Sequence, residues 1–169
     1  MSRIRRTVTI IALALGLGAV LAAPANAAPT RNDYPYAGQT GDDPWNMMKG
    51  ECTSFVAWRL QQDGRAVTKA ADGQWNGRDW DDRLSSRGWR VSQTPTVGSV
   101  AQWEAGERTY YAGSTGAWYQ AGSRGHVGYV SAVYANGDVL LQDYNRFGTR
   151  QFLSTRVPAT FVGDFVRAG

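Results

Sequence analysis

The segment from Gly50 to Leu60 constrains the fold most, because its apolar residues recur at helical spacing. Apolar side chains stand at positions 52, 55, 56 and 60, which places them on one face of a helix. Gly50 precedes this run and Gly64 follows it, and glycine commonly ends a helix at such a place. We therefore predict a helix over about 50–63 that buries one face and carries Cys52 in its first turn.

Residues 1–27 have the pattern of a secretory signal peptide. Three arginines open the chain, an apolar run extends over 8–22, and Ala-Asn-Ala at 25–27 fits a cleavage site. The run is shorter than the roughly 20 apolar residues needed to cross a bilayer, which argues against a membrane anchor. We expect cleavage before Ala28, a secreted or cell-wall location, and no membrane contact afterwards.

Residues 28–169 are predicted to form a single domain with almost no net charge. The whole chain has 18 basic and 14 acidic side chains, and three of the basic ones lie in the signal segment. The mature chain therefore carries a net charge near +1, so nucleic acid is not an expected partner. Residues 28–45 contain three prolines among aromatic residues and are read as an irregular arm that packs over the domain.

Beyond the first helix, the period of apolar residues changes from helical to alternating. A second helix is predicted over 77–86, and strands are predicted at 97–105, 126–134, 139–144, 150–157 and 160–166. Asn136-Gly137 favours a tight hairpin turn, because both residues accept positive φ values. Residues 105–124 show no clear period and are read as a long loop or a frayed hairpin. Helices followed by an antiparallel sheet indicate the α+β class.

Cys52 is the only cysteine in the chain, so it cannot form an internal disulfide. A lone thiol in an exported protein is intermolecular, buried and inert, or reactive. At a helix start it faces unpaired backbone N–H groups and the positive end of the helix dipole, which favours the thiolate. Glu51 beside it opposes this effect, so a nucleophilic role needs a base from elsewhere in the chain.

His126, the only histidine, opens a predicted strand and can supply that base. An imidazole accepts the thiol proton and later protonates the leaving amine, and a carboxylate or amide holds its orientation. The hairpin at Asn136-Gly137 brings Asp143 and Asn145 level with His126, and their spacing of two places them on one face of the strand. These residues favour a Cys–His hydrolase over the alternative of a core histidine and two strand-ending residues. One Cys and one His do not make a zinc site.

Four motifs, in this order, resemble the CHAP domain, a family of cysteine- and histidine-dependent amidohydrolases and peptidases. They are residues 50–60 (GECTSFVAWRL), 96–103 (TVGSVAQW), 125–130 (GHVGYV) and 143–145 (DYN). The resemblance runs from about Tyr34 to the end of the chain. It implies a papain-like fold, with N-terminal helices packed on an antiparallel β-sheet.

The resemblance also implies the chemistry. Cys52 matches the family's nucleophile and His126 its general base, while Asp143 and Asn145 match the groups that orient the imidazole. The implied reaction is cleavage of amide bonds in bacterial peptidoglycan, by an endopeptidase or an N-acetylmuramoyl-L-alanine amidase. The family commonly has Glu-x-Asn after the hairpin. This chain has Asp143 in place of that Glu, and the Asp side chain is one methylene shorter. Either Asp143 still reaches the imidazole, or Asn145 takes more of the orienting role.

The stretch between Trp103 and His126 is longer than expected for the family and rich in aromatic residues. We interpret it as an insertion at the rim of the cleft whose rings stack on a sugar–peptide substrate, and a solvated loop is the alternative. The candidate substrate-binding residues are Trp103, Tyr110, Tyr111, Trp118 and Tyr119.

Some family members bind calcium just upstream of the cysteine. Asp42 and Asp43 are adjacent, so their side chains diverge, and few oxygen ligands accompany them. We therefore expect no required metal. We also expect no cofactor and a monomer. The alternative function, of a different class, is a catalytically silent module that binds cell walls through its aromatic surface.

Overall fold

The computed structural model describes residues 31–69, 75–111 and 116–169. The expected signal peptide at 1–27 and the first residues of the expected arm lie outside these ranges. The described elements are, in chain order, α1 (Cys52–Gln62), η1 (Gly77–Asp79), α2 (Trp80–Ser85), β1 (Arg90–Ser92), β2 (Val100–Trp103), β3 (Arg108–Tyr110), β4 (Trp118–Gln120), β5 (His126–Val133), β6 (Val139–Tyr144), β7 (Phe152–Val157), η2 (Ala159–Phe161) and β8 (Asp164–Arg167).

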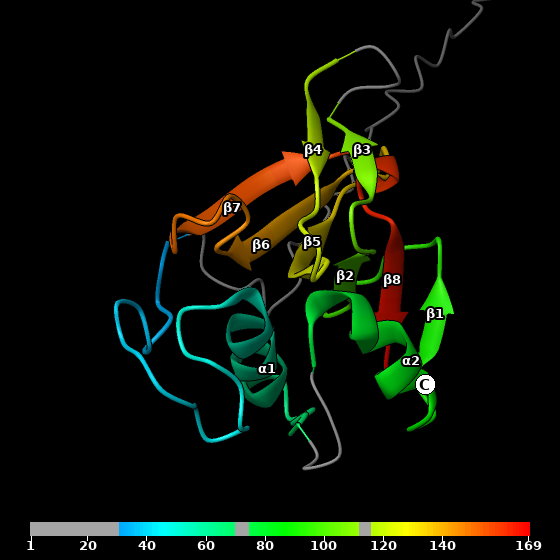
Figure 1. Cartoon of the computed structure of the whole chain (residues 1–169). Helices are drawn as coiled ribbons and strands as arrows, with labels where there is room; N and C mark the ends of the chain where they lie inside the picture. Colours follow the sequence, from blue (N-terminus) through cyan, green and yellow to red (C-terminus); the bar gives the residue numbers. More distant parts are fainter. Residues whose placement is uncertain (1–30, 70–74, 112–115) are drawn as a thin grey trace, which may run out of the picture.

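Six of the strands form one antiparallel sheet in the order β1-β8-β2-β5-β6-β7. Helix α1 packs against β5 and β6, and α2 packs against β1 and β8, so both helices lie along the same sheet (Figure 1). Strands β3 and β4 pair with each other in a separate hairpin that stands at the opposite end of the molecule from the helices (Figure 1). The arrangement confirms the predicted α+β class.

Apolar side chains form two cores, one on each side of the central strands. The first lies between the helices and the sheet and includes Phe55, Leu60 and Trp80. The second lies beneath the hairpin and η2 and includes Trp103 and Phe161. Because both faces of the central strands are covered, β2 is buried along its whole length instead of alternating between buried and exposed positions.

Helix α1 is buried from Thr53 to Leu60 and is therefore a central helix, not a surface helix with one apolar face. Its outer side is covered by the irregular segment 31–50, from which Tyr34 contacts Phe55 and Trp58 edge to face. The buried Arg59 reaches outward to Asp33, with Nη2 2.7 Å from Oδ1. The N-terminal arm thus holds α1 against the sheet.

The strand boundaries differ from the prediction where glycine and proline interrupt the pattern. Strand β2 begins at Val100 and not at Val97, because Gly98 takes φ 84° in the turn before it. Residues 160–166 divide into η2 and β8 after Pro158. The segment 105–124 contains the paired strands β3 and β4, so the hairpin interpretation is correct and the loop interpretation is not.

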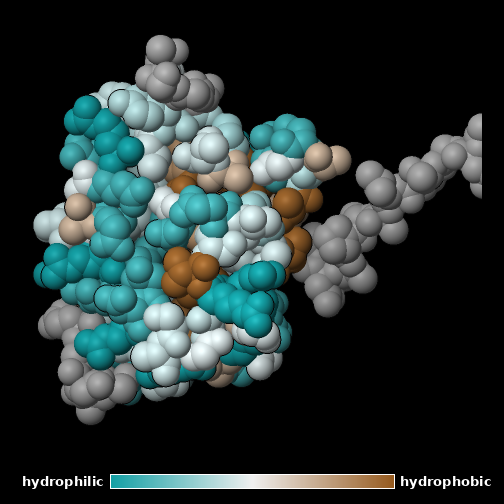
Figure 2. Space-filling view, turned by 90° about the vertical axis from the view of Figure 1, so that its right-hand side faces the viewer, coloured by the Kyte–Doolittle hydropathy of each residue, from teal (hydrophilic) through white to brown (hydrophobic). Residues whose placement is uncertain are grey.

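Strand β1 forms one edge of the sheet and is only three residues long, with Arg90 exposed at its start. Figure 2 shows the face that carries β1, β8 and α2, on which apolar surface is confined to small areas between hydrophilic ones. A short, charged edge strand limits pairing with other chains. In the described part of the chain, the helices are too short or too polar to span a bilayer.

Candidate active site

The first turn of α1 and the start of β5 meet at a cleft of about 380 Å³. Cys52 and His126 both line it, together with Glu51, Tyr119, Asn145 and Arg146. The two residues that are unique of their kind in the sequence therefore share one cavity. They come from elements that are adjacent because α1 packs directly on β5.

The nucleophile candidate lies at an uncapped helix start. Glu51 is the N-cap residue of α1 and makes no side-chain hydrogen bond to the first turn. The N–H groups of this turn are consequently available to an anion in the cleft. The Cys52 thiol is half-buried and unbonded to any other sulfur. Gly50, two residues earlier, takes φ 76°, a value that glycine adopts at low cost.

A buried hydrogen-bond network fixes the segment that leads into α1. Both oxygens of the Asp43 carboxylate accept hydrogen bonds, Oδ1 from the Trp45 and Met47 N–H groups and Oδ2 from the Ser54 hydroxyl at 2.5 Å. The Tyr34 hydroxyl lies 2.5 Å from Ser54 Oγ and accepts the Gly50 N–H at 3.2 Å. The network therefore sets the position of the chain immediately before Cys52.

The same network bears on metal binding. Asp43 is 5% exposed and its oxygens are occupied within the fold, whereas the neighbouring Asp42 is exposed. Among residues 31–69, 75–111 and 116–169, no group of three or more His, Cys, Asp or Glu side chains is arranged to hold a metal ion.

His126 is buried and held from several sides. Its Nε2 lies 3.1 Å from Asp143 Oδ2, which leaves Nδ1 for its hydrogen bond with the Cys52 side chain. A Cβ atom on Gly77 would lie 2.5 Å from the His126 backbone nitrogen, so only glycine permits η1 to approach this closely. The indole of Trp103 lies behind the imidazole, with 5.6 Å between ring centroids.

The environment of His126 favours its charged form. Burial lowers the pKa of His126, but the charge of Cys52 and the hydrogen bonds to Asp143 and Cys52 outweigh it and raise the pKa to about 9. An imidazolium beside a thiolate is the resting arrangement that a cysteine hydrolase needs, since the ring can then protonate a leaving group.

Asp143 reaches His126 diagonally across the sheet. Its direct partner on β5 is Gly128, and His126 lies two residues before Gly128 on the same face of that strand. Gly128 has no side chain to fill the space between them, and a Cβ atom there would lie 2.7 Å from Leu141 Cδ1. The shorter Asp143 thus contacts the imidazole directly.

Asn145 serves a different contact. Its Nδ2 donates to Glu51 Oε2 at 2.7 Å and its Oδ1 accepts the Arg150 N–H at 2.7 Å. Glu51 also accepts a hydrogen bond from Arg150 Nη2 at 3.3 Å, so a cation balances the charge that stands next to Cys52. The contacts of Asn145 therefore join the end of β6 to the start of α1, whereas the imidazole is in contact with Asp143.

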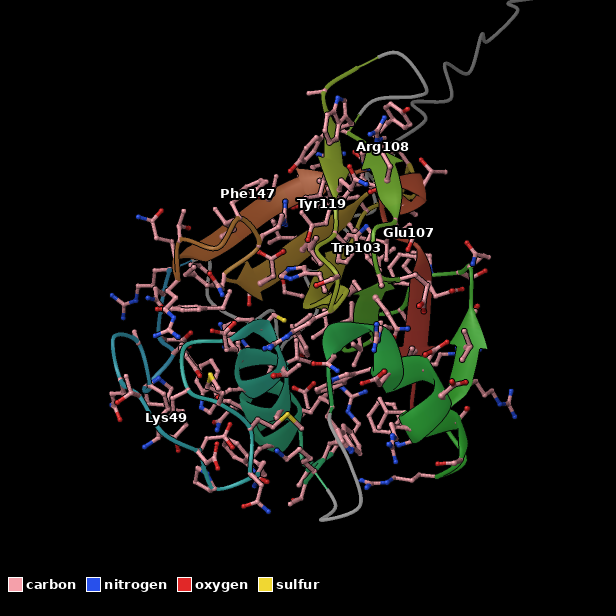
Figure 3. All side chains as sticks on the ribbon, viewed as in Figure 1. Lys49, Trp103, Glu107, Arg108, Tyr119 and Phe147 are labelled. Carbon is pink, nitrogen blue, oxygen red and sulfur yellow. The ribbon has the colours of Figure 1, made fainter. Side chains whose placement is uncertain are left out.

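The five aromatic candidates do not share one surface. Trp103 is fully buried, and its Nε1 donates to Thr109 Oγ1 at 3.0 Å and to the Phe161 carbonyl at 2.8 Å. The expectation that Trp103 stacks on substrate is therefore wrong, because its ring is part of the core behind His126. Tyr119 is 4% exposed, contacts Trp103 edge to face and lines the cleft (Figure 3).

The other three candidates lie on the hairpin. Trp118 is 52% exposed, with the Arg108 guanidinium 4.4 Å above its ring, and pairs across the hairpin with the half-buried Tyr110. Tyr111 stacks on Phe161 with 4.2 Å between centroids. Of these three, Trp118 alone has more than half of its surface free for a ligand.

Two residues of the site were not predicted from the sequence. Arg146 is buried, and its Nε donates to Asp143 Oδ2 at 2.6 Å. Phe147 is 57% exposed and stands edge to face against Tyr119 at 5.9 Å, on the turn whose neighbours line the cleft (Figure 3). Both directly follow the motif at 143–145, and only that proximity marks them in the sequence.

Burial, followed by the charges of Cys52 and Asp143, raises the pKa of Tyr119. The phenol therefore stays neutral whenever the thiolate and imidazolium are present. A neutral phenol at the cleft wall can donate a hydrogen bond to a substrate oxygen.

Comparison with known proteins places this geometry in a family. Residues 42–145 match the CHAP domain. The chain is 32% identical over 117 residues to N-acetylmuramoyl-L-alanine amidase sle1 of Staphylococcus haemolyticus, covering 69% of this chain and 30% of that protein. It is 30% identical over 117 residues to the protein of the same name from Staphylococcus aureus, covering 69% and 29%.

A crystal structure of N-acetylmuramoyl-L-alanine amidase from Staphylococcus aureus shares the fold. The TM-score is 0.55 at 22% sequence identity, over 76% of this chain and 33% of that one. The chain thus spans about a third or less of the length of these relatives. The CHAP match covers more than half of the chain and contains Cys52, His126, Asp143 and Asn145. This chain belongs to the CHAP domain family.

Proposed function

We propose that this protein is a secreted cysteine hydrolase that cleaves the amide bond between N-acetylmuramic acid and L-alanine in peptidoglycan. The observation that carries the proposal is the sequence of contacts from Cys52 through His126 to Asp143 at the wall of one cleft. The names of the relatives support the choice of bond. The expected signal peptide at 1–27 would deliver the enzyme to the cell wall, where it acts as a monomer.

In the first half of the reaction, the Cys52 thiolate attacks the amide carbonyl carbon. The negative charge moves to the carbonyl oxygen, and the N–H groups of the first turn of α1 stabilise it. The His126 imidazolium then protonates the amine nitrogen, the C–N bond breaks, and an acyl thioester remains on Cys52.

In the second half, neutral His126 takes a proton from water, whose oxygen attacks the thioester carbon. The C–S bond breaks, the carboxylic acid leaves, and the thiolate–imidazolium pair is restored. Asp143 stabilises the imidazolium at each stage and holds the ring so that Nδ1 faces the sulfur.

The rim of the cleft offers contacts for a substrate that contains both sugar and peptide. Tyr119 lines the cavity with a neutral phenol. Trp118 and Phe147 present exposed rings, and each is next in the chain to a residue that lines the cavity. Aromatic rings stack on the apolar faces of sugars, while the polar wall of the cleft suits peptide groups. Of the five aromatic residues expected from the sequence, only Trp103 is removed by its complete burial, and Tyr110 and Tyr111 remain candidates.

The test is digestion of purified peptidoglycan by the wild-type protein and by Cys52→Ala, with product masses and new end groups read by mass spectrometry. An amidase releases stem peptides that begin with L-alanine and leaves intact lactyl groups on the glycan. Cys52→Ala should lose at least about 10³-fold in rate, because no other thiol can replace the nucleophile.

His126→Ala should be equally inactive, and both variants should keep the circular dichroism spectrum of the wild type. Products cut within the peptide would support a hydrolase, but one that acts as an endopeptidase and not as an amidase. Binding to cell walls without release of any fragment by the wild type would contradict the proposal in favour of a silent binding module.

A further inference from the structure

Arg146 lies beside the candidate catalytic residues. Its side chain is 1% exposed, and its Nε donates at 2.6 Å to Asp143 Oδ2, the oxygen that lies 3.1 Å from His126 Nε2. Asp143 itself is fully buried. A buried carboxylate without an opposite charge is costly and tends to take up a proton. When His126 is neutral, Arg146 supplies the positive charge that contacts Asp143.

The backbone conformation around Asn145 places the Arg146 side chain against Asp143. Asn145 takes φ 61°, which reverses the chain after β6, and Asn tolerates this conformation better than most residues. Its side chain is anchored to Glu51 and to the Arg150 backbone. The side chain of Arg146, three residues after Asp143, is therefore directed back to the Asp143 carboxylate and not into solvent.

The other end of the guanidinium reaches the hairpin. Arg146 Nη1 donates to the Tyr111 hydroxyl at 3.1 Å, and Arg146 Cζ lies 5.5 Å from the Phe161 ring centroid. Tyr111 follows β3, stacks on Phe161 and donates its backbone N–H to the Ala117 carbonyl at 2.9 Å. One side chain thus bridges the hairpin that carries Trp118 and the carboxylate that contacts His126.

We infer that Arg146 is a positioning residue, which pairs with the buried Asp143 side chain and keeps it aimed at His126, and that Tyr111 couples this arrangement to the β3–β4 hairpin. The inference rests on the proposed function only in requiring that His126 activates Cys52. It adds a residue beyond the Cys–His–Asp contacts and a link from the substrate-facing hairpin to the reacting thiol.

The groups that titrate or carry charge around Asp143 come from every neighbouring element. They are Cys52 on α1, Tyr111 after β3, Tyr119 on β4, His126 on β5 and Arg146 on the turn. Burial lowers the pKa of Arg146, yet the charge of Asp143 and its hydrogen bond raise it overall, so the guanidinium stays charged. Arg146 is thus a permanent cation beside Asp143, and the His126 imidazolium is a second one whenever that ring is charged.

The experiment measures how fast iodoacetamide alkylates Cys52 as a function of pH, so that it needs no peptidoglycan. Arg146→Gln should slow alkylation at neutral pH by about tenfold or more. In the plot of alkylation rate against pH, the rise on the acid side (the acid limb) should move to higher pH by about one to three units. The reason is that Asp143, without the Arg146 contact, no longer holds the imidazolium in place beside the thiol. Arg146→Lys keeps the charge and should keep the acid limb close to that of the wild type.

Tyr111→Phe removes only the hydroxyl that Arg146 contacts, and should slow alkylation by about two- to threefold. Arg156→Gln is the matched control, because it breaks an exposed ion pair with Asp138 far from the cleft. Its profile should match that of the wild type. An Arg146→Gln protein with a lower melting temperature but an unchanged pH profile would show a merely structural role and overturn the inference.

If Arg146→Gln does not fold, Tyr111→Phe decides, and an unchanged rate and acid limb would reject the coupling. Peptidoglycan digestion by the same samples separates the two proposals. A wild type that alkylates as expected but releases no wall fragments would refute the proposed function and leave the role of Arg146 standing.

Discussion

His126 determines the chemistry of the cleft, because its two ring nitrogens face different partners. Nε2 contacts the buried Asp143 side chain, which leaves Nδ1 to face the half-buried Cys52 side chain. The first contact fixes the ring and the second makes it reactive. The pKa of about 9 depends on both, so it is a measurable property of the assembled site.

Since this is the only histidine, its titration can be followed by NMR without assignment in an untagged protein. We expect a pKa of about 9 in the wild type, and a fall of about one unit or more in Cys52→Ala, which lacks the thiolate charge. Because imidazolium is the form that protonates the leaving group, activity should decline as pH rises through about 9.

The same shift affects stability. The raised pKa stabilises the folded state fully below the value of about 6.5 for an unfolded histidine, and this stabilisation is lost as pH rises through about 9. In the NMR titration, the Arg156→Gln control should give the same His126 pKa as the wild type. A pKa that is unaltered in Cys52→Ala would contradict the assigned thiolate–imidazolium pair.

Some residues of the candidate site could be predicted from the sequence and others could not. Cys52 and His126 are identifiable because each is unique and stands at the start of a periodic segment, and Asp143 follows from the hairpin count. Arg146 is not identifiable in this way, because its contact depends on the positive φ of Asn145 and on the Tyr111 hydroxyl, which is 35 residues away. The role of an arginine depends on which groups its long side chain reaches in the folded protein, and no periodic pattern in the sequence reveals those groups.

Helix α1 depends on the arm that precedes it as much as on its own sequence. Tyr34 of the arm is buried against the helix, and Asp43 of the arm accepts a hydrogen bond from the Ser54 hydroxyl on the helix. Asp43→Ala removes an acceptor of three hydrogen bonds, and should lower the free energy of unfolding by about 2–4 kcal/mol. Chemical denaturation measures this loss.

Asp42→Ala is the matched control, since Asp42 is exposed, and it should change stability by less than about 0.5 kcal/mol. Because the network sets the chain before Cys52, Asp43→Ala should also reduce the alkylation rate of Cys52. Equal stability of the two variants would show that the arm does not anchor α1.

Elements with a local signal were predictable, and those defined by distant contacts were not. Periodicity and the Asn136-Gly137 turn identified α1, β5 and β6, because these features act over a few residues. Alternation could not place Trp103, since it does not reveal that a hairpin covers the outer face of β2. The short β1 was missed for a related reason, because its three residues form a strand only by pairing with β8 near the end of the chain.

Three parts of the molecule close around the cleft: the arm with α1, the six-stranded sheet, and the β3–β4 hairpin. Asp42, Glu51, Lys69 and Arg124 all line it, so the cavity offers charges of both signs. The stems of peptidoglycan, the proposed substrate, carry both carboxylate and amino groups, and such a cleft can orient them.

The arrangement of acidic residues leads to a prediction for the protein as a whole. Since Asp43 is committed to backbone and hydroxyl donors, a chelator such as EDTA should change neither the melting temperature nor the rate of wall digestion. Added calcium should be equally without effect. A loss of more than about half of the activity in EDTA, restored by calcium, would contradict this expectation.

The separate pairing of β3 with β4 has a consequence for how proteins of this architecture can diversify. The hairpin shares no strand with the main sheet, and Thr109 and Tyr119 attach its base to the core while Trp118 points outward. Loops grafted beyond that base would change the ligand-facing surface without shifting the register of the sheet. The hairpin is therefore a natural target for directed evolution towards walls of different composition, with Tyr111 and Arg146 retained so that each graft stays connected to the chemistry.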